Sequence, residues 1–362
     1  MGKIRELDGL RGLLAVWVVA VHLLPSAGFD AGQFGWFAPL FGEHMRVQIF
    51  CVLSGFVIFL MFEKWRPTWV DFMKGRVRRL YPVYILAFAL SFLMADLSLA
   101  ALQSAPFSGL RMEARVQIME SALGQPMEHV LAHVTLLHGV IPQSVLPYGA
   151  FAFLGQGWNI STEFQFYVLV PLLFLGLACG PLWRRGLVVA GCLVLWAGLR
   201  TWPNPADLAQ YAPWFALGIA SYAVWRQPHP HLKGWVVTGS ALAIFGMISM
   251  AAGIWICLFG WLLIRRDQGR GDACLRWLRH PVLQWLGQIS YSLYLLHMIP
   301  LYLGMSLING LGLGQGSYLL LLSLFTFAVS LPLSWLVLEL FEKRFVSPSR
   351  STTPSMAPQT GV

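Results

Sequence analysis

A cation and an imidazole lie eleven residues apart in one apolar run near the N-terminus: Arg11 follows Asp8, and His22 comes later in the run. On a helix this spacing covers about 16 Å. Ionisable groups inside a bilayer are costly and therefore mark functional sites. Imidazole is also the side chain best suited to general-base catalysis near neutral pH. In the alternative interpretation, Arg11 pairs with Asp8 at i, i+3 and His22 is an interhelical hydrogen-bonder.

A second group of cations comes before the apolar run that begins at Tyr81. Lys74, Arg76, Arg78 and Arg79 fall within six positions. Because Arg76 and Arg79 share one face of a helix, their guanidinium groups could bind a pyrophosphate together. The alternative is an ordinary cytoplasmic loop, which is rich in basic residues in any membrane protein.

A carboxylate stands among aromatic residues at the start of another apolar run. Glu163 lies between Trp158 and Tyr167. It could be the partner of His22 or of a bound hydroxyl group, or a favourable charge at a helix N-terminus.

A polar stripe follows one face of a later apolar run. Ser290, Tyr294 and His297 are spaced i, i+4, i+7, with Tyr291 beside them. Such stripes face other helices or a cavity. The stripe therefore predicts either contacts between helices or a lined pathway.

The composition requires a membrane to position these residues. Of 362 residues, 57% are hydrophobic and only 11% are charged, whereas soluble domains carry about 25% charged residues. The net charge of +9 comes from short basic clusters between apolar runs, which indicates membrane topology rather than a nucleic-acid partner. The five cysteines occur singly and lack metal-ligand spacing, so we expect neither a disulfide framework nor a metal site.

Apolar length and charge predict an all-α integral membrane protein with about ten transmembrane helices and both termini cytoplasmic. With nine spans, the basic cluster between Arg265 and Arg279 would be exported, against the positive-inside rule. Residues 102–162 form one long external loop, and the polar, proline-rich residues 347–362 form a disordered cytoplasmic tail. The predicted spans are 9–27, 46–63, 81–101, 163–182, 186–202, 209–226, 234–250, 252–265, 284–305 and 317–340.

Taken together, these residues resemble the membrane acyltransferase-3 family of polytopic O-acyltransferases. The similarity runs in order along nearly the whole chain. Two departures could shape the acceptor site: Cys51 stands where the family usually has Phe, and Asn159 and Thr162 differ from its commoner pattern. The matching strings are Leu7-Asp8-Gly9-Leu10-Arg11-Gly12 with His22; Phe50-Cys51-Val52-Leu53-Ser54-Gly55-Phe56; Phe72, Arg76 and Arg79 ahead of Tyr81-Pro82; Trp158 through Glu163 to Phe166-Tyr167; Ile289-Ser290-Tyr291 through His297; and Glu342-Lys343.

The resemblance implies an acyl-CoA co-substrate, commonly acetyl-CoA, used on the cytoplasmic side, with no permanently bound cofactor. Arg11, Arg76 and Arg79 fall where the family has its essential arginines, and His22 falls where it has its essential histidine. From these positions we expect the arginines to bind acyl-CoA and His22 to be the catalytic base.

The remaining polar residues receive supporting roles in the same hypothesis. Glu163 would be catalytic by orienting His22 or the acceptor. Ser290, Tyr291, Tyr294 and His297 would contact the substrate or the oxyanion.

The resemblance further implies a stand-alone acyltransferase domain over residues 1–346 in a bacterial inner membrane, without a fused extracytoplasmic hydrolase-like domain. We expect it to acylate a hydroxyl of a cell-surface or exopolysaccharide sugar, free or lipid-linked, among membrane lipids and polysaccharide assembly proteins. The alternatives are acylation of a small molecule such as a macrolide, a transporter or flippase of polysaccharide precursors, and a membrane scaffold in a polysaccharide assembly complex.

Overall fold

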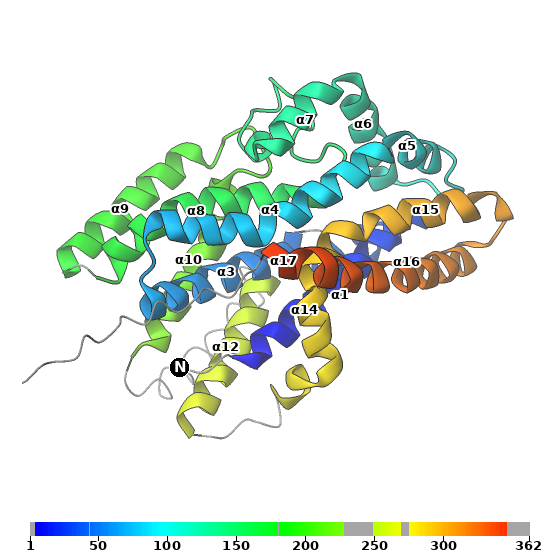
Figure 1. The fold of residues 1–362 in the computed structure, drawn as a ribbon. Helices are drawn as coiled ribbons and strands as arrows, with labels where there is room; N and C mark the ends of the chain where they lie inside the picture. Colours follow the sequence, from blue (N-terminus) through cyan, green and yellow to red (C-terminus); the bar gives the residue numbers. More distant parts are fainter. Residues whose placement is uncertain (1–3, 43, 180, 228–248, 269–274, 346–362) are drawn as a thin grey trace, which may run out of the picture.

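The computed structural model describes residues 4–42, 44–179, 181–227, 249–268 and 275–345. Within these ranges the ordered elements are helices and no strand occurs, which confirms the all-α prediction. The long helices lie roughly side by side as a bundle (Figure 1). The predicted tail, 347–362, lies outside the described residues.

The long helices follow the apolar runs. Five helical stretches are long and apolar enough to cross a membrane, and the number is seven if each of two bent pairs counts as one span. All of the predicted span 234–250 except its last two residues lies outside the described ranges, so the number of ten stays a prediction. The bounds are α1 Arg5–Ser26, α3 His44–Trp65, α4 Trp69–Leu93 with α5 Ala95–Gln103, α8 Trp158–Leu177, α9 Leu182–Leu199, α10 Leu208–Trp225, α12 Met250–Gln268, α14 Pro281–Leu296 with α15 Met298–Ile308, and α16 Gln315–Val337.

Two predicted spans are bent rather than straight. The α4–α5 pair and the α14–α15 pair each turn by 59°. The second bend lies at His297, three residues before Pro300. Because proline has no backbone N–H and crowds the preceding turn, it accounts for a break at this point. The polar stripe of α14 therefore ends at the bend, with His297.

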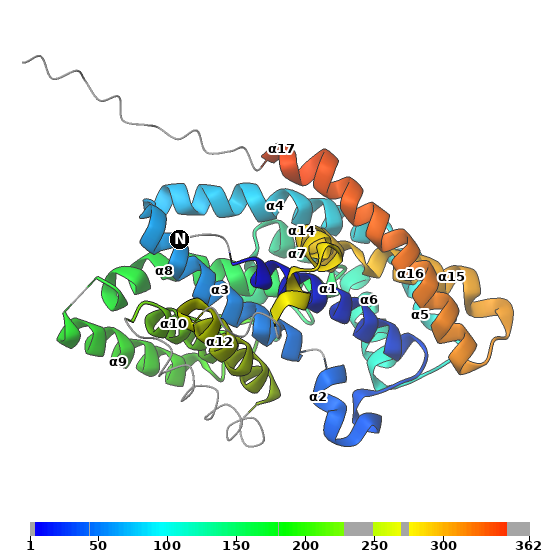
Figure 2. The same cartoon turned by 90° about the horizontal axis from the view of Figure 1, so that it is seen from below.

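Helices α1 and α14 pack against each other with their backbones in close approach (Figure 2). A Cβ atom on Gly12 would overlap the backbone of Gly287, and one on Gly287 would overlap the backbone of Asp8. Glycine is required at both positions, as at small-residue interfaces in membrane bundles. Gly12 lies beside Gly287 and His22 beside His297, so the two helices run parallel, as the first and ninth spans of the predicted topology must.

Segments predicted to be cytoplasmic meet at one end of this bundle. Glu6, at the start of α1, is 1% exposed. It pairs with Arg265 near the end of α12 and with Arg279 just before α14. These ion pairs gather three chain segments at the same end of α1, which we call the Arg11 end.

The predicted external loop folds over the opposite end, which we call the His22 end (Figure 1). It contains α6, Leu110–Gly124, and α7, Pro126–Val134, followed by short 3₁₀ turns. The rings of His133 and His138 stack with centroids 4.1 Å apart and planes 3° apart. The Tyr84 hydroxyl of α4 lies 2.9 Å from His133 Nδ1. This loop is therefore a packed part of the fold, as the moderate apolar content of residues 130–140 and 145–156 predicts.

Candidate active site

The parallel contact of α1 and α14 brings two imidazoles together. His297 Nε2 lies 3.2 Å from His22 Nδ1, and the ring centroids are 5.0 Å apart. His297 is fully buried. The sequence separates the two residues by 275 positions, so their pairing depends wholly on how the helices pack.

The surrounding carbonyls assign the ring protons. His297 Nδ1 lies 2.8 Å from the Tyr294 carbonyl and 3.1 Å from the Leu293 carbonyl, so it carries hydrogen and leaves Nε2 as an acceptor. His22 Nδ1 is then the donor, to His297 Nε2 and to the Val18 carbonyl at 2.9 Å. In a neutral His22 ring, Nε2 keeps its lone pair, as a general base requires.

A cavity of about 110 Å³ opens beside His22. Its wall combines side chains of α1, α3, α6, α8, α14 and α15 with the turn before α8. Most of the wall is aromatic or aliphatic, which excludes water from polar chemistry. The lining residues are Val18, His22, Val47, Arg115, Ile118, Met119, Phe151, Phe153, Gly155, Gln156, Trp158, Tyr294, Met298 and Tyr302.

The predicted arginines gather at the Arg11 end. The Asp8 carboxylate lies 3.6 Å from the Arg11 guanidinium, so the pair named in the alternative interpretation of Arg11 is present. Arg11 also interacts electrostatically with Arg79 and Glu163, and Arg76 interacts with Arg79 and Glu163. The structure thus brings together the three arginines that the sequence places on two separate segments, with Glu163 close to two of them, Arg11 and Arg76.

Aromatic rings hold Arg76 in place, whereas Arg79 is exposed to solvent. The Arg76 guanidinium lies 5.3 Å from the Phe72 ring centre and 5.7 Å from that of Tyr167. These are cation–π distances. One arginine of the pair is therefore fixed, and the other can adjust to a ligand.

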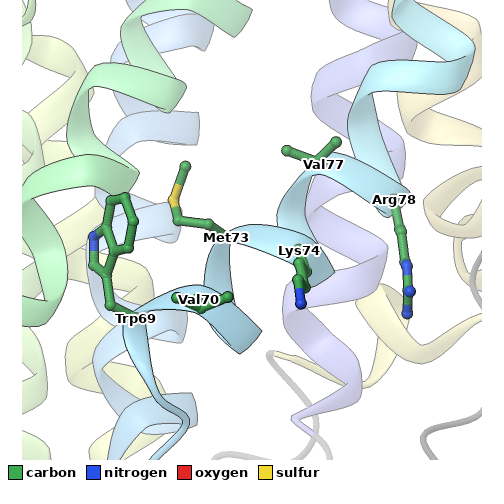
Figure 3. Close-up of a pocket in the computed structure, with 6 residues that line it drawn as sticks. All are labelled: Trp69, Val70, Met73, Lys74, Val77 and Arg78. Atoms are coloured by element: carbon green, nitrogen blue, oxygen red, sulfur yellow. The ribbon is translucent and has the colours of Figure 1, made fainter.

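The remaining cations of α4 point to a different face. Lys74 and Arg78 line an open depression of about 310 Å³ with Trp69, Met73 and two valines (Figure 3). This depression lies on the surface of α4. The basic run 74–79 thus divides between two faces of α4, and Arg78 can serve as a control for Arg76 and Arg79.

Glu163 lies with the arginines, not with His22. Its carboxylate accepts hydrogen bonds from Tyr167 at 2.6 Å and from Ser54 at 3.2 Å. Among the hydrogen bonds of the described residues, the side-chain partner of the His22 ring is His297. His297, rather than Glu163, therefore lies in position to orient this ring.

The hydroxyl groups of the α14 stripe have backbone partners. Tyr291 donates to the Leu80 carbonyl at 2.7 Å, and Tyr294 donates to the Gln156 carbonyl at 2.5 Å. Ser290 donates to a carbonyl of its own helix, 2.8 Å away. The two tyrosine hydroxyls thus join α14 to neighbouring segments, and Tyr294 also lines the cavity.

Sequence reasoning missed three polar residues near His22. Arg46 is fully buried and lies 5.5 Å from the Trp17 ring centre. Arg115 and Gln156 line the cavity. The predicted topology with ten spans leaves four cations outside the cytoplasmic segments or at the outer edge: Arg46, Arg111, Arg115 and Arg200. This was the available signal, because a cation on the less basic side needs another explanation.

The stacked imidazoles hold the turn that carries Gln156. His133 Nε2 lies 3.1 Å from the Gly149 carbonyl, and His138 Nε2 lies 3.4 Å from the Gly157 carbonyl. Burial lowers the pKa of His138 to about 4 and the pKa of His133 well below its usual value. Both rings are therefore neutral near pH 7, so they can stack on each other and still hydrogen-bond to these carbonyls.

Several helices long and apolar enough to cross a membrane, with a histidine pair beside a cavity between them, define a multi-pass membrane protein with a site inside its helical bundle. Comparison with known proteins identifies the class. The acyltransferase-domain family profile Acyl_transf_3 matches residues 4–339. This chain therefore belongs to the acyltransferase-3 family and is an acyltransferase that transfers groups other than aminoacyl groups.

Two curated relatives cover most of the chain. The exopolysaccharide production protein ExoZ of Rhizobium meliloti is 27% identical over 297 residues, or 75% of this chain and 80% of ExoZ. The acyltransferase MdmB of Streptomyces mycarofaciens is 24% identical over 339 residues, or 85% of this chain and 81% of MdmB. No solved structure matches the chain significantly.

Proposed function

We propose that this protein is an O-acyltransferase that moves an acyl group, in the first instance acetyl, from cytoplasmic acyl-CoA to a hydroxyl of a cell-surface or exopolysaccharide sugar. The bacterial inner membrane is its proposed location. Membrane lipid, a free or lipid-linked carbohydrate acceptor and polysaccharide assembly proteins are its proposed partners.

The observation that carries the proposal is the placement of two different sites on one helix. Arg11 belongs to the arginine cluster, and His22 belongs to the imidazole pair and the cavity. Eleven helical residues separate them by about 16 Å. A long substrate with a phosphate-bearing head and a reactive thioester tail matches such a separation.

The arginine cluster suits the anionic head of the donor. Guanidinium groups bind phosphate oxygens through paired hydrogen bonds. Arg79 is exposed and Arg11 is 27% exposed, so both can be reached from solvent. The charge distribution of the sequence predicts that this end is cytoplasmic, where acyl-CoA is made.

The imidazole pair suits the transfer step. His22 Nε2 takes the proton of the acceptor hydroxyl, whose oxygen attacks the acyl carbon and forms the new C–O bond. The thioester C–S bond breaks, and the sulfur leaves with the proton that His22 returns, giving free CoA. When His22 is charged, its Nδ1–H still donates to His297 Nε2 and to the Val18 carbonyl, which stabilises the imidazolium ion.

The proposed acceptor rests on similarity and on the position of the cavity. ExoZ is named for exopolysaccharide production, and part of the cavity wall comes from the predicted external loop. The name of MdmB states acyl transfer but no acceptor, so similarity to MdmB leaves the acceptor open. A small-molecule acceptor such as a macrolide is the second candidate.

The first experiment measures transfer from radiolabelled acetyl-CoA by the purified protein in lipid nanodiscs. Total cell-surface glycan is the acceptor in one series and a macrolide in the other. The wild type, His22→Ala and His44→Ala are compared. His44 is a matched control because it lies on α3 with Tyr211 as its hydrogen-bond partner, 3.3 Å away.

Label on glycan with the wild type and His44→Ala, but not with His22→Ala, is the expected result. Label on the macrolide alone would replace the proposed acceptor. Equal transfer by all three proteins would remove His22 from the chemistry. A wild type that moves no acyl group to either acceptor but binds and translocates a polysaccharide precursor would favour the flippase alternative.

A further inference from the structure

Helix α6 of the predicted external loop holds the last turn of α1 through one side chain. The Arg115 guanidinium donates to the His22 carbonyl at 3.2 Å and to Ser26 Oγ at 3.4 Å. It therefore bonds to the backbone of the residue whose imidazole faces the cavity.

The last turn of α1 needs such support. Pro25 lies inside this turn, and because proline has no N–H, the carbonyl of Val21 loses its helical partner. The turn carries no basic side chain of its own, although a cation stabilises the negative end of a helix dipole. Arg115 supplies that cation from another helix.

The side chain that binds this turn also lines the cavity. Arg115 and His22 belong to one wall, and the guanidinium interacts electrostatically with both His22 and His297. A guanidinium has five N–H donors, and two described hydrogen bonds leave others for a group in the cavity.

Helix α6 is packed against the bundle on both sides of Arg115, so this side chain can hold the end of α1 at a fixed place. Met112 and Met119 are buried on its inner side, and its Glu120 accepts a hydrogen bond from Gln103 of α5 at 3.0 Å. Residues on both sides of Arg115 along α6 are thus fixed to the bundle. The Arg115 side chain spans the gap between α6 and the His22 backbone, and its hydrogen bond to the His22 carbonyl joins the two.

We propose that Arg115 is a positioning residue for acyl transfer, which fixes the His22–His297 pair and makes α6 a structural part of the active site. This inference rests on the proposed function. Donor binding is not involved, because Arg115 lies at the His22 end and the arginine cluster lies at the other.

The test compares steady-state kinetics of the wild type, Arg115→Lys, Arg115→Gln and the control Gln117→Ala in nanodiscs. Gln117 is exposed and lies on the same helix. Small misplacements of reacting groups cost about 100-fold in rate, so we expect kcat of Arg115→Gln to fall by about that factor. The KM for acetyl-CoA should change less than about twofold. Lysine keeps the charge and one hydrogen bond, so Arg115→Lys should recover part of the rate.

Hydrogen–deuterium exchange over residues 20–27 gives a second readout that needs no activity. Exchange should be faster in Arg115→Gln than in the wild type and unchanged in Gln117→Ala. An unchanged kcat, or a KM for acetyl-CoA that rises in step with the loss of kcat, would overturn the proposal. A wild type without transfer activity would refute the proposed function instead, and unchanged exchange in Arg115→Gln would then refute the contact as well.

Discussion

The two ends of α1 are built for different kinds of recognition. At the Arg11 end, charged side chains pair with one another and reach solvent. At the His22 end, His22 lines a largely apolar cavity, and His297 contacts His22 from behind; both imidazoles are bonded to backbone carbonyls. Burying a charge is costly unless it is paired, whereas a hydrogen-bonded neutral group can be buried. In the proposed function, the anionic donor is therefore bound where charged side chains reach solvent, and proton transfer takes place beside the largely apolar cavity.

The largest expected effect is on kcat, from a substitution of His297 that alters the His22 end and leaves the Arg11 end unchanged. In His297→Phe, His22 Nδ1 loses its ring acceptor, and the charged form of His22 loses a stabilising partner. We expect kcat to fall by about 100-fold, in the range that general-base catalysis contributes, with the KM for acetyl-CoA unchanged. The measurement is labelled acetyl transfer at varied acetyl-CoA concentration. A variant with normal kcat would show that His22 works without His297.

The next largest effect concerns the arginine cluster. Changing Arg76 and Arg79 together to lysine keeps the positive charge but removes the bidentate geometry. The KM for acetyl-CoA should rise about 10-fold, equivalent to losing one good charge-assisted hydrogen bond, while kcat changes little. Arg78→Lys is the matched control, because Arg78 lies on the other face of α4 (Figure 3). Equal KM values in both variants would mean that these arginines serve topology alone.

The substitution Glu163→Gln tests whether this carboxylate acts with the arginine cluster, which would change KM, or with His22, which would change kcat. Its hydrogen bonds to Ser54 and Tyr167 and its proximity to Arg11 and Arg76 predict a KM effect of about threefold, since an amide retains hydrogen bonding but loses the charge. Kinetics with acetyl-CoA as the varied substrate check this. If kcat falls instead, with KM unaffected, Glu163 acts on the acceptor or on His22 as the sequence alone suggests.

The smallest effect is on stability. His138 has a folded-state pKa of about 4, below the value of about 6.5 for an unfolded chain. The unfolded state therefore binds more protons as the pH falls, and the contribution of His138 to stability is lost between about pH 6.5 and 4. Thermal unfolding in nanodiscs should show Tm falling across this window, with a shallower fall in His138→Phe. Parallel curves for the two proteins would exclude His138 as the cause.

The sequence predicts the elements of this site better than its pairings. Apolar length places α1, α8 and α16, and the i, i+3 spacing correctly pairs Arg11 with Asp8. Both observations depend only on residues close together in the chain.

Pairings across the bundle are not accessible in this way. His22 and His297 meet because Gly12 and Gly287 allow two backbones to touch, and one sequence does not reveal which glycine faces which helix. The predicted topology uses Arg115 only for the distribution of charge across the membrane, because nothing near it in the chain indicates that its side chain reaches the end of α1. The 59° bend at His297 was not predicted, because the apolar run 284–305 continues through it and Pro300 alone does not fix where a helix breaks.

The close contact of α1 with α14 also determines which parts of the protein can move. Two helices in backbone contact at Gly12 and Gly287 cannot rotate or slide past each other without a clash, so they behave as one rigid strut that carries Arg11, His22 and His297. In the proposed function, any movement that opens a route for the acceptor would then have to come from helices other than α1 and α14.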